Sequence, residues 1–244
     1  MPNPQLNDPN ITTKEKLRIT ETNHWVGRTR DLIIIVRKTP NGEPKINIDK
    51  RFDQGVEDER GDRGQVRKII KLALQQENIN PQKCEVSVLW AIGAQKFGNE
   101  WDVNCGHSRG GSGGSAIYLA LLSALHQKPI SRQVAATGTL TTLKSKGTVN
   151  GQEINLELGT NLPITGLKEK ITACVEKEVN KLVLSKYQSS PNLLTKKDKY
   201  NPNKELKFED FQQVISPETK EKIQVYWTEN IQDLRDLVLQ GKLS

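Results

Sequence analysis

The sequence predicts an α+β fold in which helices and mixed sheets pack around one core. Segments with strand patterns and segments with helix patterns are interspersed, without the regular alternation of a parallel α/β fold. The chain has 244 residues, 34% of them hydrophobic, which is enough to bury one sizeable core. Because only 5% of the residues are aromatic, we expect that core to be aliphatic.

The predicted organisation is one domain, residues 25–244, preceded by a flexible N-terminal segment, residues 1–24. This segment is polar as far as Thr22 and has three prolines among its first nine residues, a composition typical of chain that stays mobile or docks on a partner. It lacks the apolar run of a secretory signal. No apolar run in the chain approaches the ~20 residues that span a bilayer. We therefore expect a cytoplasmic protein without a membrane partner.

The domain is expected to begin with a β-hairpin. Asp31–Arg37 and Pro44–Asp49 have strand character and flank Asn41-Gly42, a pair that favours a tight hairpin turn. Apolar residues at helical spacing then predict an amphipathic helix over Gln65–Gln76. A second hairpin turn is expected at Asn150-Gly151. The other predicted elements are strands at 85–92, 100–105, 134–140, 153–158, 181–184 and 224–227, and helices at 116–125, 167–178, 208–214 and 231–239.

The formal net charge of +7 does not by itself indicate a nucleic-acid partner. The excess is spread over the N-terminal third and over Leu194–Lys204 and forms no stripe studded with aromatic residues, so this lysine-rich segment is interpreted as a solvated loop. The three cysteines, Cys84, Cys105 and Cys174, are widely spaced and odd in number. We therefore expect reduced thiols, with neither a disulfide framework nor a zinc site, and no metal or other cofactor.

Ser112 stands in a glycine-rich run, Ser108 to Ser115, directly before an apolar helix pattern that begins at Ala116. Glycines let a backbone approach a reacting carbonyl closely, and the first N–H groups of a helix stabilise negative charge. A hydroxyl in this setting is a candidate nucleophile, with oxyanion donors expected from Ser112 and its loop neighbours Gly111 and Gly113.

From Gly110 onward the chain resembles the proteolytic domain of Lon-type proteases. That family has a serine in a Gly-Pro-Ser-Ala-Gly turn, a buried helix ending in Ser-Ala-Leu, a proline, a Met-Thr-Gly strand and a Pro-Ile-Gly-Gly-Leu-Lys-Glu-Lys segment that opens a helix. The matching motifs here are Gly111-Ser112-Gly113-Gly114, Ser123-Ala124-Leu125, Pro129, Ala136-Thr137-Gly138 and Leu162 to Lys170. The resemblance covers about Val26 to Leu239 and implies the fold of that domain.

Three departures from the family pattern accompany these motifs. Gly111 replaces the proline before the serine and Gly113 replaces the alanine after it, so the loop is expected to be more flexible. Arg109 stands where the family has an acidic residue. Extra residues between Leu143 and Leu162 imply an extended hairpin.

The resemblance implies a serine peptidase in which Ser112 is the nucleophile, Lys168 the general base and Thr137 a hydroxyl that orients the lysine. A lysine acts as a base only when neutral, and Leu162, Ile164, Leu167 and Ile171 are expected to give Lys168 an apolar setting that favours the neutral form. Lys170, two positions further on, is expected to point into solvent.

The resemblance also implies partners. The substrate would be a protein or peptide, and self-association, as in the hexameric rings of Lon-type domains, is plausible. The phosphate-binding pattern GxxxxGK[ST] does not occur in the sequence. We therefore expect a separate ATPase or regulatory partner that delivers substrate or activates the domain.

Several alternatives stay open at this point. His107 and Asp102 could form a Ser-His-Asp triad with Ser112, although His107 is better interpreted as a residue on the rim of the site. Ser115 is a second hydroxyl candidate but is expected to cap the following helix. The glycine-serine run also resembles the phosphate loop of small-molecule kinases related to galactokinase. A catalytically silent domain used for assembly or nucleic-acid binding is the third reading.

Overall fold

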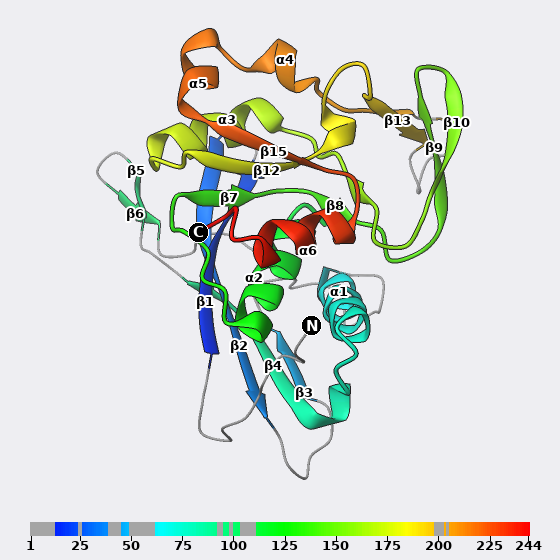
Figure 1. Cartoon of the computed structure of the whole chain (residues 1–244). Coiled ribbons are helices and arrows are strands. Elements are labelled where there is room, and N and C mark those ends of the chain that lie inside the picture. Colours follow the sequence, from blue (N-terminus) through cyan, green and yellow to red (C-terminus); the bar gives the residue numbers. More distant parts are fainter. Residues whose placement is uncertain are drawn as a thin grey trace.

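The computed structural model describes residues 13–23, 26–38, 45–48, 62–91, 95–97, 100–102, 111–197, 203 and 205–244. It confirms the predicted α+β class, since helices pack against mixed sheets (Figure 1). The helices are α1 (Asp62–Gln76), α2 (Gly114–His126), α3 (Leu167–Glu176), α4 (Phe211–Val214), α5 (Pro217–Lys222) and α6 (Ile231–Leu239). Short 3-10 turns, η2 (Pro81–Lys83) and η3 (Lys186–Gln188), precede β4 and follow β12.

A seven-stranded sheet with the order β15-β12-β7-β1-β2-β4-β3 forms the centre of the molecule. Its strands are β1 (Thr13–Asn23), β2 (Val26–Lys38), β3 (Lys45–Ile48), β4 (Cys84–Ala91), β7 (Val134–Ala136), β12 (Lys181–Ser185) and β15 (Gln224–Thr228). The strands β7, β12 and β15 run parallel to one another, whereas β1 and β4 are antiparallel to β2. Thr137, a residue of the site described below, directly follows β7 in the parallel part.

The expectation of a flexible segment over residues 1–24 is wrong for Thr13–Asn23. These residues form β1, which pairs along its whole length with β2 and parallel with β7. Leu17 and Ile19 are its only large apolar residues, separated by Arg18 and flanked by charged and polar residues, so the composition resembles that of a solvated tail even though the alternation suits a strand. The segment therefore joins the two halves of the sheet.

The expected hairpin between the next two strands is also corrected. The strand β3 pairs parallel with β4 instead of β2, and β4 lies between them. Parallel strands need a long crossover connection, and α1, which lies between β3 and β4 in the sequence, supplies it. The proposed turn at Asn41-Gly42 lies outside the described residues.

The helix α2 is the core of the fold. All its residues from Gly114 to Leu125 are buried, and it lies between the sheet and the two helices α1 and α6 (Figure 1). Side chains of α2 and α6 meet at Glu77, the residue after α1, whose carboxylate is bound by His126 Nε2 at 2.8 Å and by Arg235 Nε at 2.6 Å. This ion-pair cluster fixes the helices around α2.

A second sheet of four antiparallel strands, in the order β10-β9-β13-β14, extends to one side. Its strands are β9 (Ser145–Val149), β10 (Gln152–Leu156), β13 (Leu194–Lys197) and β14 (Glu205–Lys207). The predicted turn at Asn150-Gly151 is confirmed, with both residues at positive φ, as a tight hairpin requires. The predicted solvated loop is corrected at its start, because β13 pairs with β9.

The remaining elements connect these sheets. Two short strand pairs are β8 (Thr139–Leu140) with β11 (Asn161–Leu162), and β5 (Gln95–Phe97) with β6 (Glu100–Asp102). The helices α3, α4 and α5 lie above β12 and β15 in Figure 1, and α6 lies below them. The helix expected from residue 208 begins only at Phe211, because the Asp210 side chain caps it by accepting from Gln212 N at 2.9 Å.

Candidate active site

Ser112 lies in a tight turn immediately before α2. Gly114 N donates to Gly111 O at 3.0 Å, and Gly113, with φ −83°, is the N-cap of the helix. The carbonyl of Ser112 accepts from Gly138 N at 2.8 Å, which ties the turn to the strand region that follows β7. Ser112 is partly exposed. It therefore stands at the positive end of a buried helix, with its backbone fixed.

Two glycines allow the close approach of this turn to its neighbours. A Cβ on Gly111 would lie 2.9 Å from Thr139 Cγ2, and a Cβ on Gly138 would lie 2.1 Å from Asn161 Oδ1 and 2.5 Å from Ser115 Oγ. Real Cβ atoms do not approach other atoms this closely. Only glycine therefore fits at position 138 without displacing its neighbours. At position 111 a side chain would require the Thr139 side chain to move.

The lysine beside Ser112 is Lys170. Its Nζ lies 3.2 Å from Ser112 Oγ and 3.4 Å from Thr137 Oγ1. The Lys170 side chain is only 3% exposed, which is rare for a lysine. Lys168 is exposed, so the prediction that Lys168 is the lysine of this site is corrected to Lys170, and the expectation that Lys170 points into solvent is wrong.

The periodicity of α3 explains the correction. Residues two apart on a helix point about 200° apart, so Lys168 and Lys170 cannot both face the core. The buried face is formed by Leu167, Lys170, Ile171 and Cys174, which follow the spacing i, i+3, i+4, i+7 of an amphipathic helix. This spacing was present in the sequence and identifies Lys170.

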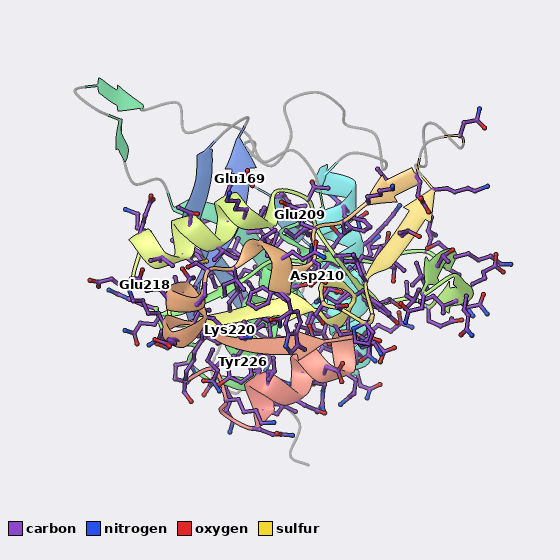
Figure 2. The ribbon with its side chains drawn as sticks, turned by 90° about the horizontal axis from the view of Figure 1, so that it is seen from above. Glu169, Glu209, Asp210, Glu218, Lys220 and Tyr226 are labelled. Atoms are coloured by element: carbon purple, nitrogen blue, oxygen red, sulfur yellow. The ribbon has the colours of Figure 1, made fainter. Side chains whose placement is uncertain are left out.

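The start of α3 is fixed by polar contacts from a distant segment. Gly166, with φ 67°, is its N-cap, and the first helical N–H, that of Leu167, donates to Glu209 Oε2. Figure 2 shows Glu169 on α3 and Glu209 with Asp210 at the start of α4. Gln188 supports the same junction, because its amide donates to Ile164 O and to Glu209 O. These contacts hold the turn of helix that carries Lys170.

Thr137 contacts both the Ser112 turn and Lys170. It is 1% exposed, and its Oγ1 donates to Ser112 O at 3.1 Å. Its backbone N donates to Val183 O at 3.1 Å, which anchors it to β12. The Ser112 hydroxyl before α2, the Lys170 amine on α3 and the Thr137 hydroxyl after β7 therefore converge.

A comparison with family models matches residues 107–240 to the Lon protease (S16) C-terminal proteolytic domain. The match covers more than half of the chain and includes Ser112, Thr137 and Lys170. The chain belongs to this family. A search of curated proteins finds no match.

Family membership confirms the resemblance and supports a serine protease of Lon type. The matched region contains α2, α3 and the second sheet. The strands β1 to β4 and helix α1, which complete the central sheet and the core of this Lon domain, lie before it.

Ser115 does not cap α2 in this Lon domain, which corrects the expectation. It lies within the helix, fully buried, and its Oγ donates to Asn161 Oδ1 at 2.7 Å. The N-cap is Gly113, which has no side chain to cap with. His107 and Arg109, and the side chain of Asp102, lie outside the described residues.

The described part of the chain contains no group of three or more His, Cys, Asp or Glu side chains placed to hold a metal ion. Within the same residues, no helix is long and apolar enough to cross a membrane. Cys84 and Cys174 are buried and not disulfide-bonded, and burial raises the pKa of the Cys84 thiol. Cys105 lies outside the described residues.

Proposed function

We propose that this chain is a serine endopeptidase in which Ser112 is the nucleophile and Lys170 the general base. The observation that carries the proposal is the 3.2 Å approach of Lys170 Nζ to Ser112 Oγ, inside a domain of the Lon family. Serine needs a base to remove its proton during attack. An amine within hydrogen-bond distance of the hydroxyl meets the geometric condition for this role.

The burial of Lys170 supports the chemistry. Removing an amine from water disfavours its charged form, and Lys170 is 3% exposed. The N-terminal partial charge of α2, which begins two residues after Ser112, acts in the same direction. We infer that the amine is neutral when substrate binds, so that its lone pair accepts the proton of Ser112.

The proposed reaction needs only groups in this chain, a peptide bond and water. Ser112 Oγ forms a bond to the peptide carbonyl carbon while its proton passes to Lys170 Nζ. The tetrahedral intermediate collapses, the C–N bond breaks, and Lys170 returns the proton to the leaving amine. A water molecule, deprotonated by Lys170, then attacks the acyl carbon; the ester C–O bond breaks, the acid product leaves, and Lys170 returns the proton to Ser112 Oγ. We therefore propose that peptide hydrolysis by this chain does not require ATP.

Thr137 is proposed to orient the base. Its Oγ1 already donates to Ser112 O, so its lone pairs are available to receive an N–H of Lys170 at 3.4 Å. This contact directs the amine toward Ser112 Oγ. Thr137 therefore acts on the lysine and does not itself take the proton.

The N–H groups of the Ser112 loop are proposed to bind the oxyanion. The next two N–H groups along the chain already have acceptors within the fold, because Gly114 N donates to Gly111 O and Ser115 N donates to Gly138 O. The N–H groups of Ser112 and Gly113, flanked by Gly111, are the loop donors proposed for the negative oxygen. Each such donor is worth about 10²-fold in rate or more.

The proposed substrate is an unfolded protein or peptide. The family supports a protein substrate and self-association, and we propose that this chain assembles with copies of itself. A separate ATPase or regulatory partner that delivers substrate remains part of the proposal.

The test is covalent labelling of Ser112. The purified chain is treated with a fluorophosphonate probe, digested and analysed by mass spectrometry, and hydrolysis of fluorescently labelled casein is measured in parallel, with and without ATP. The proposal expects one modified peptide, containing Ser112, and loss of labelling and hydrolysis in Ser112→Ala. Labelling of another serine, or unchanged hydrolysis by Ser112→Ala, contradicts it. Ser123→Ala, in the same helix, is the matched control and should be labelled normally.

A further inference from the structure

A line of hydrogen-bonded polar side chains lies buried behind the Ser112 loop. Ser115 Oγ donates to Asn161 Oδ1 at 2.7 Å, and Asn161 Nδ2 donates to Thr228 Oγ1 at 2.8 Å. Thr228 Oγ1 in turn donates to Leu184 O at 3.1 Å. None of the three side chains is more than 1% exposed. We call Ser115, Asn161 and Thr228 the Asn161 network.

The Asn161 network joins elements that are distant in sequence. Ser115 is in the first turn of α2, Asn161 is in β11 and Thr228 ends β15. The backbone of Asn161 is held as well, because its N donates to Glu229 O at 2.7 Å and its O accepts from Ser185 Oγ. Asn161 is thus fixed at both its backbone and its side chain.

The network touches the site through Gly138. The Asn161 amide and the Ser115 hydroxyl occupy the space where a Cβ on Gly138 would stand. Gly138 N donates to Ser112 O, and Gly138 O accepts from Ser115 N. The residue before Gly138 is Thr137, which contacts Lys170. One amide side chain therefore packs on the backbone segment that connects Ser112 to Thr137.

The direction of the hydrogen bonds makes this arrangement specific. Ser115 can donate to the Asn161 oxygen while Thr228 donates to Leu184 and accepts from the Asn161 nitrogen. If the Asn161 amide were turned over, so that its nitrogen faced Ser115 and its oxygen faced Thr228, at least one of these contacts would be lost. An unpaired buried polar group destabilises the fold. A fully satisfied buried network therefore selects one geometry, where apolar side chains of similar volume would tolerate several.

We propose that Asn161 is a positioning residue for the Ser112 reaction. Through Ser115 and Gly138 it fixes the first turn of α2 against the Thr137–Gly138 segment, and so sets the approach of Ser112 Oγ to Lys170 Nζ. The inference rests on the proposed function of Ser112. The inference goes beyond that function by assigning a role to residues that do not touch the reacting atoms.

The test compares Asn161→Leu with Thr160→Val in peptide hydrolysis. Asn161→Leu keeps the side-chain volume and removes both polar atoms. Thr160 is the adjacent buried residue, but its hydroxyl donates to Glu157 O and not to α2. We expect Asn161→Leu to lower kcat about 30-fold with KM changed less than about twofold, because misplacement of reacting groups by a fraction of an ångström has costs of this order. Thr160→Val should keep kcat within about twofold.

Two further variants keep the test informative if Asn161→Leu does not fold. Ser115→Ala and Thr228→Val remove the two ends of the network, and Ser115→Ala should lower kcat more, because Ser115 lies nearer to Ser112. The double variant Ser115→Ala/Asn161→Leu should be no slower than Asn161→Leu alone, since both act through one contact.

The rate of fluorophosphonate labelling of Ser112 is measured for each variant, together with the melting temperature. Labelling slowed in step with kcat supports positioning. If Asn161→Leu melts at a lower temperature but keeps the labelling rate and kcat of the parent chain, the residue is merely structural and the inference is wrong. If Ser112→Ala is itself active, the proposed function fails instead, which the same assay distinguishes.

Discussion

Lys168 and Lys170 lie two residues apart on α3, and their environments are opposite: Lys168 is exposed, whereas Lys170 is buried and reaches Ser112 Oγ at 3.2 Å. Ser112 and Lys170 are 58 positions apart in the sequence. Their approach depends on the packing of α3 beside the start of α2, with Thr137 between them.

This pair of lysines supplies a matched experiment. Lys170→Met should lower kcat by about 10³-fold or more, because it removes the proposed base, whose contribution is typically about 10² to 10⁴. Lys168→Met makes the same substitution at an exposed position and should leave kcat within about twofold. Hydrolysis of labelled casein by the two variants checks this. An active Lys170→Met, with its fold intact by circular dichroism, would exclude Lys170 as the base.

Thr137 should have a smaller effect than Lys170. Thr137→Val keeps the shape of the side chain and removes the hydroxyl that contacts both Ser112 O and Lys170 Nζ. Loss of a hydrogen bond of about 1.5 kcal/mol corresponds to about a tenfold decrease in rate. We expect kcat about tenfold lower than in the parent chain, measured with a saturating peptide. Thr137→Ser, which restores the hydroxyl, should recover most of the loss, and a failure to recover would argue against an orienting role.

The nucleophile region and the second half of the fold could be predicted from the sequence. The Ser112 turn, the buried helix behind it and the Asn150-Gly151 hairpin depend on local spacing and turn chemistry, which a single sequence displays. The choice between Lys168 and Lys170 was also local, but it required the helical period of Leu167, Ile171 and Cys174, and the motif alone was misleading.

Other features depend on contacts that no local pattern displays. The pairing of β1 with β7 and of β3 with β4 is set by the topology of the sheet. Ser115 looked like a helix cap because serine is common there, but its partner is Asn161, 46 positions away. Buried polar contacts of this kind become visible only when the fold brings their partners together.

Gly138 should tolerate no side chain. A Cβ there would lie 2.1 Å from Asn161 Oδ1, so Gly138→Ala must displace the Asn161 network or the Ser112 backbone. Overpacking of this kind costs about 1–3 kcal/mol, and we expect both a lower melting temperature and a loss of activity. Gly147→Ala is the control, because its Cβ would meet Leu194 Cδ1 at 2.7 Å in the second sheet. It should destabilise the chain but leave kcat unchanged at a temperature where it is folded, and equal losses of kcat would contradict the prediction.

Tyr187 and Glu229 should make stability depend on alkaline pH. Tyr187 Oη donates to Glu229 Oε1 at 2.9 Å, and burial, followed by this hydrogen bond and the Glu229 charge, raises the pKa of Tyr187 to about 12. An unfolded tyrosine loses its proton near pH 10. The folded state therefore holds the proton more tightly, and the stability that this provides is complete below pH 10 and is lost as the pH rises toward 12.

Tyr187→Phe tests this coupling. It should lower the free energy of unfolding by about 1 kcal/mol at pH 8, as expected for one hydrogen bond, and by less at pH 11. Urea unfolding of both proteins at the two pH values measures the difference. Glu229 O also accepts from Asn161 N. The variant therefore also tests whether the contact between Tyr187 and Glu229 helps to hold the backbone next to the Asn161 network. If the free energies of unfolding of the two proteins differ equally at pH 8 and pH 11, Tyr187 does not titrate as described. If the difference is larger at pH 11, folding lowers the pKa of Tyr187, and the prediction is wrong.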